Sequence, residues 1–211
     1  MIVPLSRPYV ARGGTPEVEF VDQRIFHLTY FHHCMACGFC HDSCCQFGAT
    51  IEEPKLAALL ERADELEEFT GVPREGWFAD CWRNDVEYPG GRYTRTQVRE
   101  TPRGDRCVFT NPDGRGCQLH AFAVHRGLPV HDLKPMSCTM FPVLWDKKTL
   151  IVPLEIEDQT LVCIDSGLTL YRSARNDLEY FFSPELVAEL DELERKWMAR
   201  PGMLHLPLAA S

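Results

Sequence analysis

The sequence predicts a small, irregular α+β domain built around clustered cysteines, with short strands, a β-hairpin and about four helices. Three observations lead to this fold class. Apolar residues recur at helical spacing in some segments, form short strand-like runs in others, and are separated by long stretches rich in glycine and proline. Because 211 residues are enough for one core, we expect residues 1–211 to form a single domain.

The chain begins without a helical pattern. Residues 1–16 hold three prolines and a Gly-Gly pair, which predict an extended arm or loop. The β-branched and aromatic residues of 18–31 predict one strand, or two short ones, leading into the cysteines. Residues 51–69 repeat leucine at three- and four-residue spacing, so we expect one amphipathic helix, capped by Thr50 and ended by Gly71.

The middle of the chain is less regular. Residues 72–105 show little period, which predicts a long loop with short strands at about 93–98. A short helix is expected at 118–126, followed by a proline-bounded turn at 134–142. Apolar runs at residues 149–156 and 160–165, separated by three polar residues at 157–159, predict the hairpin within residues 145–165.

The C-terminal part predicts two helices, at 173–182 and 184–199. Ser183 is the expected N-cap of the second helix, and a proline follows it at the first helical position. We expect the hairpin and these helices, residues 145–200, to pack on a motif core at about residues 34–142.

Composition and charge exclude several classes of protein. A hydrophobic fraction of 45% and a charged fraction of 25% are typical of a globular chain. A formal charge of −9 should repel nucleic acid and anionic membranes. The N-terminus lacks a secretory signal pattern, and no apolar run approaches the length of a membrane span, so we expect a cytoplasmic location.

Cysteine clustering is the strongest functional signal. Five of the ten cysteines lie within the twelve residues of CMACGFCHDSCC, and the segments CVFTNPDGRGCQLH and KPMSCTMFP add three more. Cytosolic thiols stay reduced, so clustered ones are more often metal ligands than disulfides. A C-x2-C knuckle places two thiolates on one ion. The candidate metal ligands are Cys34, Cys37, Cys40, Cys44, Cys45, Cys107, Cys117 and Cys138.

These segments predict a metal-centred domain that holds zinc. Eight thiolates would suit two tetrahedral zinc sites. The alternative is iron: the first four cysteines have the C-x2-C-x2-C-x3-C spacing of bacterial ferredoxins, although Cys45 stands where those proteins have proline. An iron or iron-sulfur protein of this kind would have a redox or catalytic role, on a substrate near the arginines of residues 92–106. A third hypothesis is a metallochaperone with a protein partner.

The three segments together resemble the CxxCxxCC proteins, the YkgJ-like cysteine cluster family of zinc- or iron-chelating domains. The resemblance spans about residues 34–142 and matches three separated motifs in order. It implies chelation of zinc or iron by the matched cysteines. The chain departs from the pattern at two positions: His41 replaces the second cysteine of the family's Cys-Cys pair, and Lys134 stands where the family usually has arginine.

Several other residues have two interpretations. His41 and His120 are either metal ligands or hydrogen-bond partners of the ligands. Cys81 and Cys163 lie outside the motifs and are expected to be small buried hydrophobes. The arginines of residues 92–106 are either a solvated loop or an anion contact. The sequence contains no HExxH, GxSxG, P-loop or GxGxxG motif, so it does not support a hydrolase or nucleotide-binding assignment.

Overall fold

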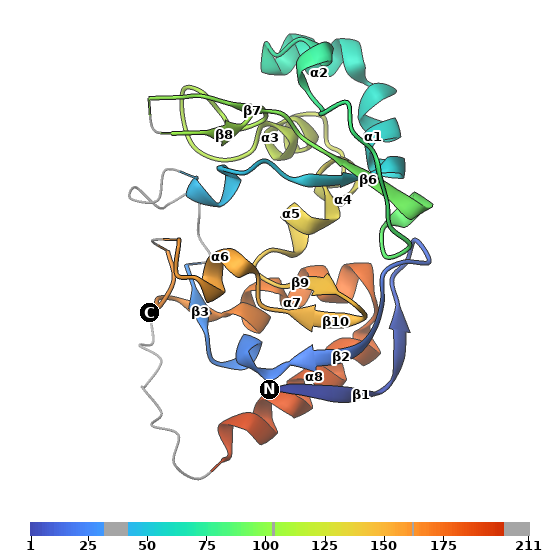
Figure 1. The fold of residues 1–211 in the computed structure, drawn as a ribbon, viewed down its shortest axis with the longest axis vertical. Coiled ribbons are helices and arrows are strands. Elements are labelled where there is room, and N and C mark those ends of the chain that lie inside the picture. Colours follow the sequence, from blue (N-terminus) through green and yellow to red (C-terminus); the bar gives the residue numbers. More distant parts are fainter. Residues whose placement is uncertain (32–41, 103, 162, 201–211) are drawn as a thin grey trace.

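The chain folds into an α+β structure, which confirms the predicted class (Figure 1). The computed structural model describes residues 1–31, 42–102, 104–161 and 163–200. The strands are β1 (Ile2–Val10), β2 (Glu17–Asp22), β3 (Thr29–Tyr30), β4 (Thr50–Glu52), β5 (Arg83–Asn84), β6 (Arg92–Arg95), β7 (Val98–Arg99), β8 (Arg106–Cys107), β9 (Leu144–Asp146), β10 (Thr149–Ile151) and β11 (Leu168–Thr169). The helices are α1 (Glu53–Leu60), α2 (Ala63–Thr70), α3 (Gln118–His125), α4 (Val130–Leu133), α5 (Met136–Met140), α6 (Leu154–Glu157), α7 (Leu170–Phe181) and α8 (Pro184–Met198).

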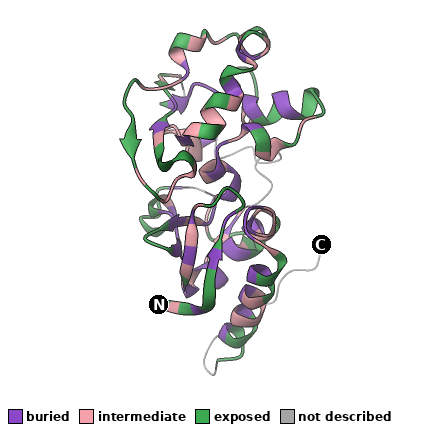
Figure 2. Cartoon of the chain, turned by 90° about the vertical axis from the view of Figure 1, so that its right-hand side faces the viewer, coloured by how far each residue is buried: buried purple, intermediate pink, exposed green. Residues whose placement is uncertain are grey.

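The buried apolar residues form two clusters. The first core combines both ends of the chain: β1 and β2 pack with β9, β10, α7 and α8. The second core is built from the segment between them, mainly α1 to α4 and the strands near them. Figure 2 shows buried residues in both lobes of the molecule. The chain passes from the second core to the first at Lys134 and Pro135, since Leu133 belongs to the second and Met136 to the first.

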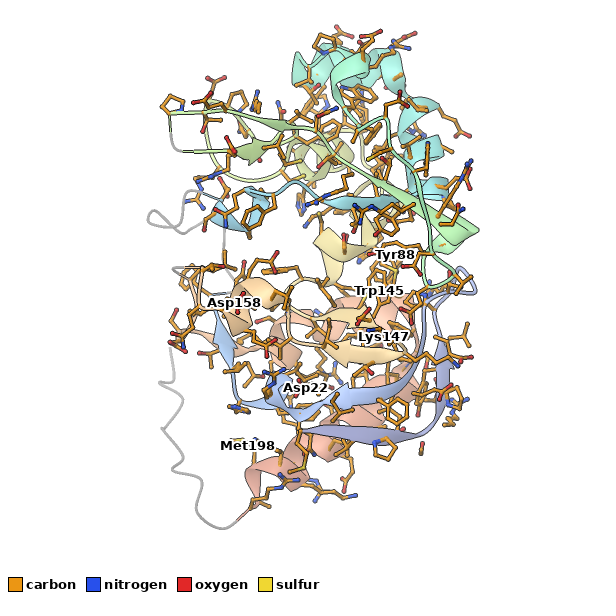
Figure 3. The ribbon with its side chains drawn as sticks, viewed as in Figure 1. Asp22, Tyr88, Trp145, Lys147, Asp158 and Met198 are labelled. Atoms are coloured by element: carbon orange, nitrogen blue, oxygen red, sulfur yellow. The ribbon has the colours of Figure 1, made fainter. Side chains whose placement is uncertain are left out.

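Side chains also connect the two cores. The rings of Tyr88 and Trp145 lie 5.4 Å apart, and Figure 3 shows these two residues close together where the lobes meet. Glu87, next to Tyr88, accepts hydrogen bonds from the backbone N–H groups of Lys147 and Lys148 at 2.8 and 2.7 Å. The loop before β6 is therefore fastened to the β9–β10 hairpin.

The N-terminal segment is a strand, so the expected arm or loop was wrong. β1 lies at the edge of a sheet with the order β1-β2-β10-β9. The Ser6 N–H points away from β2 and donates to the Glu189 carboxylate at 2.6 Å. In a strand, the N–H groups of alternate residues point to the same side, so an N–H at position 4 would also point away from β2. Proline at that position therefore costs no hydrogen bond between β1 and β2. Proline excludes a central strand, but it suits an edge strand.

The structure has eight α-helices among the described residues, where the sequence predicted about four. The expected helix at 51–69 is divided into α1 and α2 at Glu61 and Arg62, two good helix formers that give no warning of a break. Thr50 lies in β4 and is not a cap, whereas Gly71 ends α2 as expected, with φ 67°. The other additional helices, α4, α5 and α6, are single short turns that each begin directly after a proline. The expected turn at 134–142 therefore contains a helix.

The hairpin forms at a different place from the predicted one. β9 and β10 pair around Lys147 and Lys148, which both have positive φ and so make the two-residue turn normally associated with Asn-Gly. Pro153 then ends the extended run and starts α6. The second apolar run, residues 160–165, forms no named strand among its described residues. Ile164 makes an isolated antiparallel bridge to Tyr30, and Leu161 and Cys163 are buried in the first core.

Other elements agree with the sequence. Residues 18–31 contain two strands, short strands occupy residues 92–99, and α3 ends two residues before Gly127. Both C-terminal helices are present, and the Ser183 hydroxyl accepts from the Leu186 N–H as the N-cap of α8. Among the described helices, none combines the length and the apolar composition that crossing a bilayer requires.

Glu189 should contribute to stability by holding β1 on α8. Its carboxylate accepts from the Ser6 N–H, the Ser6 hydroxyl and the Tyr9 hydroxyl. Burial acts to raise the pKa of Glu189, but these hydrogen bonds outweigh it and the pKa is lowered. The stabilisation is therefore complete above the ordinary carboxyl pKa and is lost as the pH falls through the folded-state value. Glu189→Gln should lower the free energy of unfolding by about 1 kcal/mol at pH 7, and by less at pH 3, in urea titrations.

Glu192→Gln is the matched control for this prediction. Glu192 lies on the same helix but pairs only with the exposed Arg195 and Lys196. Its replacement should change the free energy of unfolding by less than about 0.5 kcal/mol. Equal losses in the two variants would contradict the role given to Glu189.

Candidate metal centre

The five described candidate cysteines come from three parts of the chain. Cys44 and Cys45 lie in the short 3-10 helix Ser43–Cys45. Cys107 ends β8, Cys117 precedes α3, and Cys138 lies within α5. All five are free thiols. The other candidates, Cys34, Cys37 and Cys40, and the alternative ligand His41, lie outside the described residues.

The described thiols influence one another. A hydrogen bond between Cys44 and Cys45 lowers the pKa of Cys44 to about 7 and raises that of Cys45 well above its ordinary value. Cys138 and Cys117 contribute to the raised pKa of Cys45 after this hydrogen bond and burial. Burial raises the pKa of Cys107, and the nearby Cys117 acts in the same direction. The fold therefore brings cysteines of all three segments into one neighbourhood.

Lys134 supplies positive charge to this neighbourhood. Burial acts to lower the pKa of its amine, but the thiolate forms of Cys138, Cys117 and Cys45 act in the opposite direction and the net shift is upward. Burial raises the pKa of Cys138 strongly, and Lys134 partly opposes that shift. Lys134 therefore supplies positive charge close to these cysteines.

His120 lies close to Lys134 but is exposed. It stands on α3, three residues after Cys117. Partial desolvation lowers the pKa of its imidazole, and the charge of Lys134 acts in the same direction. An exposed, neutral imidazole at this position suits a hydrogen-bonding role as well as ligation, so the two interpretations of His120 both stay open.

Asp42 and Arg115 join the first cysteine segment to the second. Arg115 donates from Nε and Nη2 to the two carboxylate oxygens of Asp42, at 3.0 and 3.1 Å. The pair is well shielded from solvent, with side-chain exposures of 8% for Asp42 and 17% for Arg115. Two parallel charge-assisted hydrogen bonds fix orientation as well as distance. The ion pair thereby holds Asp42 and Arg115, which are 73 positions apart in sequence, in a fixed relative orientation.

The turn that carries Asp42 is locally unfavourable. Asp42 has φ 58°, in the left-handed region, which costs roughly 1–2 kcal/mol for a residue with a Cβ, although aspartate tolerates it better than most. Its backbone carbonyl accepts from the Cys45 N–H at 2.9 Å. Its carboxylate makes no cap hydrogen bond to the 3-10 helix that it precedes, because it faces Arg115.

The loop at residues 110–117 presents Arg115. Thr110 and Cys117 form an antiparallel bridge that closes the loop. The Asn111 side chain accepts from the Asp113 N–H, and the Asn111 N–H donates to the Gly116 carbonyl at 2.9 Å. Gly116 has φ 87°, which favours glycine directly before Cys117. The Gly-Arg-Gly sequence thus holds an arginine and a cysteine at one end of a closed loop.

Thr96 connects the first segment to Cys107. Its hydroxyl accepts from the Cys107 thiol at 3.3 Å and from the Ala49 N–H at 2.8 Å. Gly48 has φ 71°, and a Cβ at that position would lie 2.9 Å from the Thr96 carbonyl oxygen. Glycine is required for this approach. The chain leaving Cys45 therefore packs directly on the residue that orients Cys107.

The third segment is fixed by two polar contacts with β4. The Ser137 hydroxyl donates to the Thr50 carbonyl at 3.1 Å. The carboxylate of Glu52, which is only 3% exposed, accepts from the Met136 N–H at 3.1 Å, at the start of α5. Cys138 follows directly on these contacts. β4 thus positions α5 relative to the cysteines of the second core.

The described thiols do not form a complete metal site by themselves. Within residues 1–31, 42–102, 104–161 and 163–200, no three His, Cys, Asp or Glu side chains lie close enough together to hold an ion. Their chemistry nevertheless fits zinc or iron: they are reduced sulfur donors, Cys107 buried and the other four partly buried, with a lysine nearby. Ligation by the eight predicted cysteines stays a prediction.

The arginines of residues 92–106 contact the protein itself. Arg92 pairs with Glu53 and lies 4.6 Å over the Trp82 ring. Arg95 and Arg99 donate to backbone carbonyl oxygens at 2.7 and 2.6 Å. Arg106 is buried and donates to the Asp105 carbonyl oxygen. Arg103 lies outside the described residues. These contacts give the described arginines structural roles, and an anion contact stays a prediction.

The two cysteines outside the motifs differ from each other. Cys163 is buried in the first core, at 2% exposure, as expected. Cys81 is exposed, so its interpretation as a buried hydrophobe was wrong. The cause is local: Cys81 lies just before β5, an exposed two-residue strand at the edge of its sheet.

Sequence reasoning missed the residues that hold the three segments together. None of these residues is among those that the sequence predicted for the site: Asp42, Arg115, Thr96, Glu52 and Ser137. The signal for the ion pair was present in the motifs, because Asp42 and Arg115 are opposite charges that each lie two residues from a candidate cysteine.

Comparisons with known proteins give no family assignment. No model of a known protein family matches this chain. No solved structure matches it either.

Glu52→Ala should destabilise the junction. It leaves the buried Met136 N–H without its acceptor, so the free energy of unfolding should fall by about 1–3 kcal/mol in urea titrations. Glu52→Gln keeps an acceptor oxygen and should cost much less.

The pH dependence provides the control for this pair of variants. Burial raises the pKa of Glu52, so the folded state favours the protonated acid. The stability contributed at this site should therefore fall as the pH rises from the ordinary carboxyl pKa to the raised value. Glu52→Gln should remove that slope. A slope unchanged in the glutamine variant would contradict this account.

Proposed function

We propose that this chain is a cytosolic zinc-binding protein whose ligands are thiolates from three separated segments. The observation that carries the proposal is that hydrogen bonds join the three cysteine segments to one another or to shared neighbours. Arg115 donates to Asp42, Thr96 accepts from both Cys107 and Ala49, and Ser137 donates to the Thr50 carbonyl. The three motifs that resemble the CxxCxxCC family are the same three segments.

A bound metal ion would stabilise the deprotonated form of these cysteines. Burial and mutual proximity raise the pKa of Cys45, Cys107 and Cys138, so without a metal they are held as neutral thiols. A bound zinc ion would hold them as thiolates and supply the positive charge that the site otherwise draws only from nearby side chains. Lys134 would offset the remaining negative charge of a site with four thiolates on each ion.

The role that this arrangement supports is structural. The candidate ligands come from both cores, because Cys138 lies in α5 beside the first-core residue Met140, whereas Cys107 belongs to the second core. Metal binding would therefore fasten the cores to each other. Structural zinc contributes about 10–16 kcal/mol of apparent binding free energy at pH 7, and only to the folded chain.

Elemental analysis of the anaerobically purified protein tests the identity of the metal. We expect a colourless protein containing zinc in stoichiometric amount. A brown protein with absorbance near 400 nm and stoichiometric iron would show the iron or iron-sulfur alternative to be right.

Serine substitutions test the ligands. Cys117→Ser and Cys138→Ser should each lower the metal content of the purified protein substantially, because serine is a poor ligand for a soft thiolate site. Cys81→Ser is the matched control and should retain the wild-type content, since Cys81 is exposed and outside the motifs. Full metal content in both motif variants would contradict the proposed ligand set.

Chelation tests the structural role. Removing the metal with a strong chelator should change the far-ultraviolet circular dichroism and lower the thermal midpoint, because the metal stabilises only the folded chain. An unchanged spectrum and midpoint after complete removal would rule out a structural role.

A further inference from the structure

The Asp42–Arg115 contact has features that stability alone does not require. Both residues lie inside the cysteine segments: Asp42 is two residues before Cys44, and Arg115 is two residues before Cys117. Asp42 takes up a left-handed conformation and leaves its own 3-10 helix without a side-chain cap. The carboxylate is therefore used for the contact with Arg115 and not for the local turn.

Each residue of the ion pair is also linked through the backbone to a candidate cysteine. The Asp42 carbonyl accepts from the Cys45 N–H, so a shift of Asp42 would move the turn that carries Cys44 and Cys45. Arg115 sits in a closed loop in which Gly116 alone separates it from Cys117. The bidentate ion pair therefore sets the distance and orientation between the turn that carries Cys44 and Cys45 and the loop end that carries Cys117.

We propose that Arg115 is a positioning residue of the metal site, which acts through Asp42 to hold the Cys44–Cys45 turn at the correct geometry relative to Cys117. This inference rests on the proposed metal binding. Arg115 is not itself a ligand, because a guanidinium has no lone pair to donate and stays protonated. Its effect is to pre-organise thiols that would otherwise have to be brought together when the ion binds.

A second bidentate ion pair, which is more exposed and whose Asp191 also contacts Arg172 and Tyr171, provides a control. Arg175 on α7 donates to both carboxylate oxygens of Asp191 on α8, at 3.3 and 2.9 Å. This pair also joins two separate elements, but it lies among the helices of the first core and away from the cysteine segments. Arg175→Met should therefore reproduce the general loss of an ion pair without disturbing the thiols.

The experiment measures zinc affinity and cobalt spectra. Metal-free wild-type protein, Arg115→Met, Arg115→Lys and Arg175→Met are titrated with Zn²⁺ against a competing chromogenic chelator. They are then titrated with Co²⁺, and the thiolate-to-cobalt charge-transfer band is recorded. Arg115→Met should bind zinc about 10–100-fold more weakly than wild type, the range found for residues that orient metal ligands, and should alter the cobalt band. Arg115→Lys should lie between them, because it keeps the charge but loses the two-pronged geometry.

The results separate this inference from the proposed function. Wild-type zinc affinity and an unchanged cobalt band in Arg115→Met would overturn the inference while leaving the proposed metal binding intact. An equal weakening in Arg115→Met and Arg175→Met would overturn it too, because the effect would then be general destabilisation. Failure of the wild-type protein itself to bind Zn²⁺ or Co²⁺ would overturn the proposed function and with it the inference.

Asp42→Asn provides a second route if Arg115→Met does not fold. Asparagine tolerates the left-handed conformation as aspartate does, so the turn itself is preserved. It keeps one acceptor oxygen but loses the charge and the second acceptor. The inference requires weaker zinc binding in this variant as well, and an affinity equal to that of wild type would overturn it.

Discussion

The fold depends on how β4 holds α5 at the boundary between two separately packed cores. β4 belongs to the second core through Ile51, and α5 belongs to the first through Met136 and Met140. At the start of α5, the Glu52 carboxylate accepts from the Met136 N–H and the Thr50 carbonyl accepts from the Ser137 hydroxyl. Burying a carboxylate is unfavourable unless it is hydrogen-bonded, so these contacts form together. The position of Cys138 follows from them.

The same boundary concentrates the chemistry of the molecule. Thiols, a lysine and a bidentate ion pair lie close together there, each partly removed from water. Such groups would be costly to bury one at a time, because an isolated charge or polar group loses its hydration. Arg115 satisfies Asp42, Thr96 satisfies both Cys107 and the Ala49 N–H, and Lys134 lies against the thiols. These polar groups are therefore satisfied largely by one another.

The sequence predicted the elements whose signal is local. The two C-terminal helices follow from leucine spacing and the Ser183 cap, and α3 follows from its apolar pattern and Gly127. What failed depends on distant partners. β1 pairs with β2 on one side, and on its outer edge the Ser6 N–H reaches Glu189, more than 180 residues away. The hairpin turn at Lys147 and Lys148 relies on the Glu87 carboxylate, and no pattern near residue 147 reports that contact.

The candidate site shows the same division. Clustered cysteines are visible in the sequence because spacing alone identifies them, whereas the side chains that orient them are ordinary polar residues with no distinctive spacing. Asp42 resembles any turn former until its partner is known. Outside the site, the break between α1 and α2 is equally invisible in the sequence, because Glu61 and Arg62 both favour a helix and yet the helix is interrupted there.

The first core is made from both ends of the chain, and this has a consequence for synthesis. As the chain leaves the ribosome, β1 and β2 emerge early, yet β10, α7 and α8 follow only after more than a hundred further residues. The second core, whose residues are contiguous, can fold in the interval. During that time β1 and β2 lack the strand and helices that cover them, and exposed strand edges are prone to pair with other chains. Pro4 and Pro8 interrupt the N–H groups of β1, so the nascent protein has protection from aggregation before its own helices arrive.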